Sequence, residues 1–206
     1  MDNQKNTLWN VLLFGAIWGI VEATLGYVLQ FLPSLVSGSV MFPVGATILF
    51  YAYRKTGSRK SLFGVALIAA AIKSVNLFMP GLMPIKTYNP MIAILLQTLV
   101  VVAVVDRFES PSFAVRIPAL IAVGFAWRSL FLFNIAINNA LTGFPFPQLG
   151  SLSAALDYLL LLGAMEGLIL VVMSLSVFRL PVFRKRPNPA LVLGLVALAF
   201  VLTIWI

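Results

Sequence analysis

Most of this chain consists of long apolar runs separated by short basic or proline-rich segments, and this alternation restricts its possible folds more than any other feature. A helix needs about 20 consecutive apolar residues to cross a bilayer core. Seven runs suggest spanning helices, at residues 8–31, 38–53, 61–79, 91–106, 114–138, 152–178 and 189–206. Only 10% of the residues are charged, against about a quarter in soluble domains. The expected fold class is an all-α integral membrane protein, a compact bundle of six to seven transmembrane helices.

The basic residues predict how this bundle lies in the membrane. Eleven of the fourteen fall near the N-terminus or in alternate loops: Lys5, Arg54, Lys55, Arg59, Lys60, Arg107, Arg116, Arg179, Arg184, Lys185 and Arg186. Cytoplasmic loops are enriched in lysine and arginine. We therefore expect a multi-pass protein of the cell membrane with a cytoplasmic N-terminus and, if seven runs span, an outer C-terminus. The net charge of +8 is then a topology signal and does not indicate nucleic acid as a partner.

The chain divides into two expected parts. Residues 1–180 are predicted to form a six-helix, membrane-embedded bundle that binds a solute, and residues 181–206 a basic cytoplasmic loop with an additional seventh helix. The first run is too long for the apolar part of a signal peptide, so we expect it to remain as a helix.

The first run carries a carboxylate about halfway along. On a helix, Gly15, Gly19, Glu22 and Gly26 share one narrow face, because they are spaced by four, three and four residues. A lone carboxylate in hydrocarbon costs about 2.5–3.5 kcal/mol on insertion scales. This face is therefore expected to point into protein or into a wet cavity.

Three more ionisable side chains, Lys73, Arg128 and Glu166, lie inside apolar runs at a similar expected depth. Ions in hydrocarbon are costly unless paired. We predict that Glu22 pairs with Lys73 and Arg128 with Glu166, and the swapped pairing remains open. Two asparagines share helix faces with the two bases, at spacings of three and eleven residues. The predicted substrate-binding residues are Glu22, Lys73, Asn76, Arg128, Asn139 and Glu166.

Two outer loops, residues 80–90 and 141–150, are rich in proline and glycine yet apolar. Such loops either fold back as caps over a cavity or rest Phe144 and Phe146 in the headgroup layer. With the ions and amides, they suggest a pocket for a small polar solute that enters from outside. In the alternative interpretation, the ion pairs only fix helix packing and the asparagines form hydrogen bonds between helices.

The sequence contains no cysteine and no histidine. Disulfides, thiol chemistry, the common zinc and haem ligands and the usual general base are therefore absent. We expect no metal, no cofactor and no enzymatic activity. The chain also lacks a G-x-x-x-x-G-K-[ST] loop, so energy for transport would come from a partner or an ion gradient.

Small residues spaced by four predict close helix contacts, either inside the bundle or with a partner. Two such pairs are glycines in the first and sixth runs, and two alanines lie one face away in the first run. The residues are Gly15, Gly19, Ala16, Ala23, Gly163 and Gly167.

Over residues 8–180 the chain resembles the substrate-binding S component of energy-coupling-factor (ECF) importers of vitamins and micronutrients. The resemblance rests on about six helices, a cytoplasmic N-terminus, the Gly15 and Gly19 pair in the first run, and the expected pocket under outer loops. It implies that small residues of the first helix meet a transmembrane coupling subunit and that two ATPases drive transport. The seventh run departs from the six helices of that family.

The favoured function is a membrane-embedded solute-binding subunit of an importer for a micronutrient or small polar metabolite. Two other classes remain open. One is a structural or assembly subunit of a larger membrane complex, in which the ion pairs fix packing. The other is a stand-alone proton-coupled carrier in which Glu22 or Glu166 takes up the proton.

Overall fold

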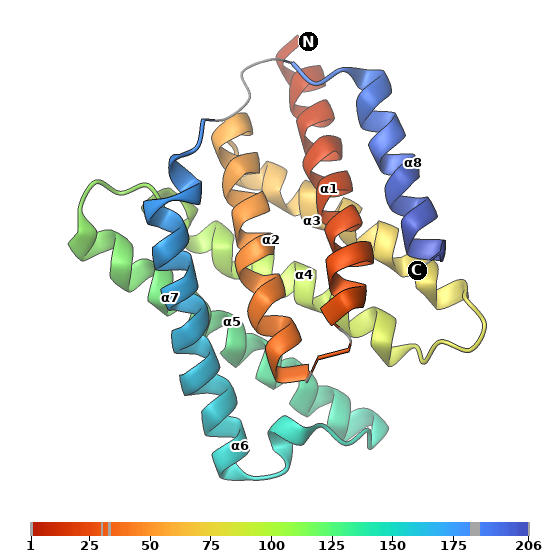
Figure 1. Cartoon of the computed structure of the whole chain (residues 1–206), viewed down its shortest axis with the longest axis vertical. Helices are drawn as coiled ribbons and strands as arrows, with labels where there is room; N and C mark the ends of the chain where they lie inside the picture. Colours follow the sequence, from red (N-terminus) through yellow and green to blue (C-terminus); the bar gives the residue numbers. More distant parts are fainter. Residues whose placement is uncertain (1, 30, 33, 182–185, 206) are drawn as a thin grey trace.

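A computed structural model describes residues 2–29, 31–32, 34–181 and 186–205 of the chain, and within these ranges it contains helices and no strands. Figure 1 shows their arrangement. The α-helices are α1 (Asp2–Leu29), α2 (Ser34–Thr56), α3 (Arg59–Ser74), α4 (Ile85–Val104), α5 (Phe113–Thr142), α6 (Leu152–Leu156), α7 (Leu162–Leu175) and α8 (Pro189–Trp205). Single turns extend or join them: η1 (Val75–Phe78), η2 (Val105–Arg107), η3 (Pro147–Leu149), η4 (Asp157–Leu161) and η5 (Val177–Arg179).

Five of the described helical segments are long and apolar enough to cross a membrane: Asn6–Leu29, Arg59–Phe78, Ile85–Arg107, Phe113–Thr142 and Leu152–Arg179. The predicted class of all-α membrane protein agrees with this result. The helix α8 is apolar but has 17 residues, slightly fewer than the ~20 that a bilayer core needs. The sequence predicted six to seven spans. Whether α2 and α8 span the membrane in addition to these five segments therefore stays a prediction.

The helix α1 packs against α2, α3 and α8, and α5 packs against α7. In Figure 1, α8 starts at the same end of the molecule as the N-terminus and runs beside α1. The core between the helices contains large side chains with almost no exposed surface, among them Trp18, Phe42, Leu49 and Phe50. Of the predicted basic loop before α8, residues 182–185, with Arg184 and Lys185, lie outside the described residues.

The small residues of α1 form an internal contact with α3. A Cβ atom added at Gly15 would lie 2.6 Å from Cγ2 of Ile68, and one added at Gly19 would lie 2.7 Å from Cδ1 of Ile72. Ala16 and Ala23, one face away, are also buried. All four residues therefore serve helix packing within the chain, one of the two roles predicted for them.

An even closer contact joins α5 to α7. A Cβ atom added at Gly124 would lie 2.3 Å from the carbonyl oxygen of Gly163, and one added at Gly167 would lie 2.6 Å from Cα of Ile121. Each of these neighbours is a backbone atom, so the two helix backbones touch at this crossing. The predicted glycine pair of the sixth run, Gly163 and Gly167, therefore also serves helix packing within the chain.

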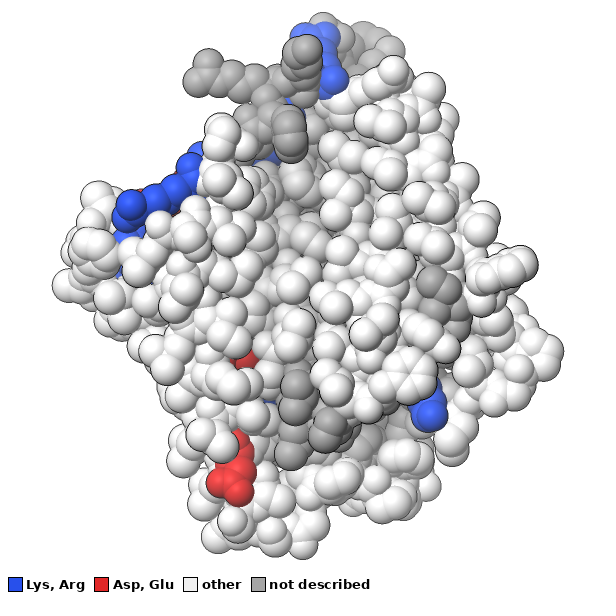
Figure 2. Space-filling model, in the orientation of Figure 1, with Lys and Arg blue, Asp and Glu red and all other residues white. Residues whose placement is uncertain are grey.

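Charged side chains gather at the end of the molecule that carries the N-terminus (Figure 2), and most of the remaining visible surface is uncharged. Arg54 at the end of α2 forms an ion pair with Glu109, and Arg59 at the start of α3 forms one with Asp106. Arg54 also donates to the carbonyl oxygens of Phe178 and Leu180, at 3.1 and 2.9 Å. These bonds tie α2 to the segment that follows α7.

Candidate functional site

A cavity of about 470 Å³ lies at the end of the bundle opposite the N-terminus. Its walls come from the second half of α1, the last turn of α3, the first turns of α2, the part of α4 up to Gln97, the middle of α5, the loop after α5 and Tyr158 of η4. Four charged residues line it: Glu22, Lys73, Lys86 and Arg128. Three of these were predicted as binding residues from their depth, and the structure brings all three to one cavity.

Arg128 is the most completely enclosed of these ions, with 1% of its surface exposed. Its Nε donates to Oε2 of Glu166 at 3.0 Å, and its Nη2 donates to Oε1 of the same carboxylate and to Oγ of Ser39 at 2.7 Å. The guanidinium also lies over the ring of Tyr158, 4.5 Å from the centroid. The predicted Arg128–Glu166 pair is confirmed, and it is a bidentate pair of the strong kind.

The start of α2 packs against this guanidinium at Gly38. A Cβ atom added at Gly38 would lie 3.6 Å from both terminal nitrogens of Arg128, so α2 approaches the charged group closely. The bonds to Glu166 and Ser39 use Nε and Nη2, and Nη1 is not among these donors. Arg128 is therefore held at a fixed place in the cavity wall, while Glu166 lies behind it, with no exposed surface and outside the cavity lining.

Tyr158 reaches Arg128 because a π-turn, Asp157–Leu161, joins α6 to α7. In a regular α-helix, eight residues would leave Tyr158 and Glu166 about 80° apart around the axis. A π-turn closes i→i+5 hydrogen bonds and so rotates less per residue, which brings the two side chains toward the same side. Both then contact Arg128. Regular helix periodicity does not indicate a π-turn. For this reason Tyr158 was not predicted as a site residue.

The opposite part of the cavity contains Glu22 and Lys73, with 8% and 7% of their surface exposed. They interact electrostatically, but the predicted ion pair is wrong, because among the described side chains no nitrogen–oxygen contact within 4.0 Å joins them. Glu22 extends along its own helix, where Oε2 would lie 3.4 Å from a Cβ atom at Gly26. The Glu22 carboxylate therefore lies beside Gly26, one turn further along α1.

Besides Glu166, two further predicted binding residues do not line the cavity. Asn139 donates from Nδ2 to the carbonyl oxygen of Phe144 at 2.9 Å and so holds the loop after α5. Asn76 lies in η1, because α3 ends at Ser74, and so the spacing of three from Lys73 does not place both in one wall. Its role as a binding residue is not supported, because the helical face it was assigned to ends before it.

The loop after α5 folds back against the cavity, as one of the two sequence interpretations expected. Gly143, in the left-handed region with φ of 68°, ends α5 and turns the chain. Phe144, Phe146 and Gln148 then line the cavity. The other loop is shorter than predicted, because α4 already begins at Ile85.

Several lining residues were not predicted. Amides come from Asn89, Gln97 and Gln148, and ring faces from Trp127, Phe131 and Tyr158. Gln97 is 3% exposed and lies against Gly45, where an added Cβ atom would be 2.6 Å from its Oε1. The sequence contained a signal for this residue, because Gln97 is a polar side chain in the middle of the apolar run 91–106. Lys86 lies within residues 80–90, which were expected to form an outer loop, and is instead part of α4.

The lining combines charged groups, amides and aromatic side chains around a partly open cavity, a composition typical of small-molecule pockets. Within the described residues no group of three or more acidic side chains forms a cluster that could hold a metal ion. Comparisons with protein-family models, with curated proteins and with solved structures found no match to this chain.

Proposed function

We propose that this protein is a membrane-embedded solute-binding subunit of an importer, with the solute held in the cavity between α1 and α5. The observation that carries the proposal is the convergence of Glu22, Lys73 and Arg128, from three separate helices, on one cavity. Its volume of about 470 Å³ lies within the range of about 300–1,000 Å³ usual for small-molecule pockets. The proposed solute is a micronutrient or a small polar metabolite.

The arrangement of Glu22 and Lys73 supports binding over a purely structural role. If two buried opposite charges only fixed helix packing, we would expect them to be in direct contact, because contact offsets the cost of taking them out of water. These two line the same cavity without touching. A polar group of a solute between them would supply the missing contacts.

The proposed orientation places the N-terminus in the cytoplasm, because the basic ends of α2 and α3 lie at that end of the bundle. The cavity then opens from the outer half of the membrane, as an importer requires. A transmembrane coupling subunit with ATPases is the proposed energy source. Because Gly15, Gly19 and Ala16 are covered inside the chain, that subunit would meet another surface.

The test is thermal unfolding of the purified full chain in detergent against a panel of small polar metabolites. We expect one compound to raise the unfolding temperature, with a gain of about 2.7 kcal/mol at a concentration 100 times its Kd. Lys73→Gln should remove this gain, because it deletes the ammonium group from the cavity wall.

Lys60→Gln is the matched control, since Lys60 is exposed at the start of α3, at the other end of the bundle. It should leave the gain intact. Folding of each variant is checked by its elution as a single species and by its own unfolding transition. A folded Lys73→Gln protein that is stabilised as much as the wild type would refute this site.

A further inference from the structure

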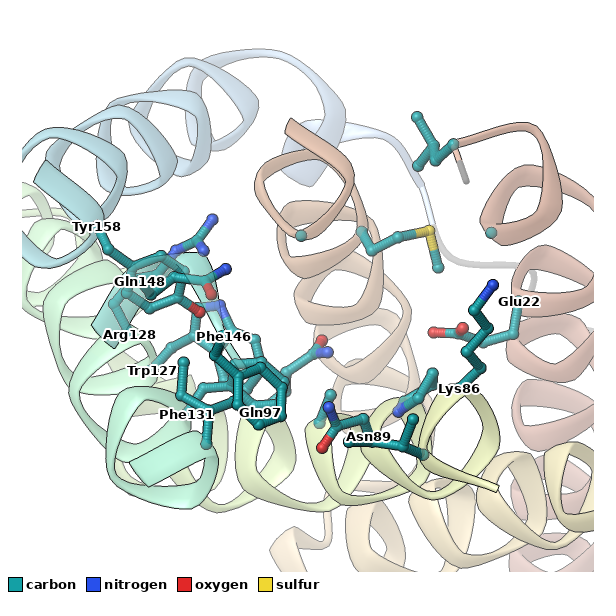
Figure 3. Close-up of a pocket in the computed structure, with 18 of the residues that line it drawn as sticks. Glu22, Lys86, Asn89, Gln97, Trp127, Arg128, Phe131, Phe146, Gln148 and Tyr158 are labelled. Atoms are coloured by element: carbon teal, nitrogen blue, oxygen red, sulfur yellow. The ribbon is translucent and has the colours of Figure 1, made fainter. Parts of the chain in front are cut away.

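The cavity has two chemically different ends, and Figure 3 shows them on opposite sides of the view. Arg128, Tyr158, Gln148 and Trp127 lie at one end, and Glu22 and Lys86 at the other. Lys73 belongs to the second end, because it interacts electrostatically with Glu22. A solute that fills the cavity meets both ends, so its own two ends should differ in chemistry.

The first end is electrically neutral and rich in rings. Glu166 neutralises Arg128 through two hydrogen bonds. Trp127 is stacked on Phe42, with centroids 5.5 Å apart and planes 7° from parallel, and it lies 5.0 Å from the ring of Phe131. Phe131 and Phe146 are half-buried and line the cavity, so parts of their rings remain open to it. Flat aromatic surfaces of this kind favour a planar ring in the ligand.

The second end carries net positive charge. Among the described lining residues it has two ammonium groups, Lys73 and Lys86, and one carboxylate, Glu22. One positive charge is therefore left over. Lys73 is 7% exposed, and burial strengthens its interaction with a ligand, whereas Lys86 is exposed at the rim of the cavity. A ligand group with one negative charge balances this end, whereas a neutral group leaves the excess and a cationic group increases it.

From these two ends we infer that the solute is a monoanion with a planar ring, in which the ring lies near Trp127 and Phe131 and the acidic group near Lys73 and Lys86. The inference rests on the proposed binding function and specifies its ligand class. Lys86 is then a specificity residue at the exposed rim of the cavity, where its ammonium group attracts an anionic compound and repels a cationic one.

Four probe compounds test the inference on the full chain in detergent, with thermal unfolding and calorimetry as readouts. Indole-3-acetate has both features, indole-3-acetamide lacks the charge, tryptamine reverses it, and cyclohexaneacetate lacks the planar ring. We expect indole-3-acetate to bind at least about tenfold more tightly than the amide, because charge-assisted hydrogen bonds to lysine would be lost. Tryptamine and cyclohexaneacetate should both bind more weakly than indole-3-acetate.

Lys86→Gln should reduce the preference for the acid over the amide several-fold, because it removes one of the two ammonium groups at this end. The residue is exposed, so the variant is expected to fold. Lys60→Gln again serves as the control and should keep the preference. An unchanged preference in Lys86→Gln would overturn the role of this lysine.

Equal binding of the acid and the amide would overturn the charge inference, and equal binding of cyclohexaneacetate would overturn the ring inference. If none of the four probes binds while another metabolite stabilises the protein, the ligand class is wrong and the proposed function stands. If no compound of either panel binds, both are wrong.

Discussion

Replacing Glu166 with glutamine is expected to lower the free energy of unfolding by about 3–5 kcal/mol, because it leaves the Arg128 guanidinium as an unpaired buried charge. The two side chains are 1% and 0% exposed, so water cannot replace the lost partner. Glutamine has nearly the same shape as glutamate, so the effect reports charge and hydrogen bonding more than volume. Thermal unfolding in detergent measures the change.

The matched control is Glu109→Gln, which breaks the half-exposed pair with Arg54. Exposed pairs contribute about 0–1 kcal/mol, so this variant should unfold close to the wild type. The double variant Arg128→Met with Glu166→Leu removes both charges and should be more stable than Glu166→Gln alone. A Glu166→Gln protein as stable as the wild type would show that the pair does not hold the bundle together.

The second large effect is expected from Gly124→Ala, which places a methyl group at the crossing of α5 and α7. The new Cβ atom would lie 2.3 Å from the carbonyl oxygen of Gly163 and 2.9 Å from the backbone nitrogen of Gly167. Because backbone atoms cannot rotate away, the helices must separate. Overpacking costs typically about 1–3 kcal/mol, and we expect a value at the upper end of this range.

Gly194→Ala is the control for the helix-forming preference of alanine itself. In α8 nothing lies within 4 Å of a Cβ atom added at Gly194. Alanine is favoured over glycine in a helix interior by about 0.5–1 kcal/mol, so this variant should be slightly more stable than the wild type. Equal stability of the Gly124→Ala and Gly194→Ala proteins would contradict the close crossing.

The helical part of the fold follows well from the apolar runs, and the differences lie at the ends of helices. The predicted run 61–79 corresponds to α3 and η1 together, from Arg59 to Phe78. The run 91–106 misses the first turns of α4, because Pro90 was interpreted as the end of a loop and instead lies within the helix. Pro90 is the sixth residue of α4, so the helix continues through it without the bond that its nitrogen would donate to the carbonyl oxygen of Lys86.

The candidate site was predictable in part. The similar depth of four ions along their helices indicated that they lie near one another, and Arg128 does pair with Glu166. Depth does not determine rotation around the helix axis. For this reason the Glu22–Lys73 contact was wrong and Tyr158 was missed. Asn76 was assigned to the α-helical face of Lys73, but α3 changes to the 3-10 turn η1 before it.

The sequence by itself determined that this chain forms apolar helices of membrane-spanning length, which helix ends carry the basic residues, and where along its helix each buried ion lies. These properties depend on local composition and on the constant rise per residue of a helix. The tertiary structure alone decided which ions touch, and that Glu22 and Lys73 face a cavity without contact. The physical reason is that helix rotation and spacing are set by long-range contacts, such as the glycine contacts of α1 with α3 and of α5 with α7, and locally by the π-turn before α7.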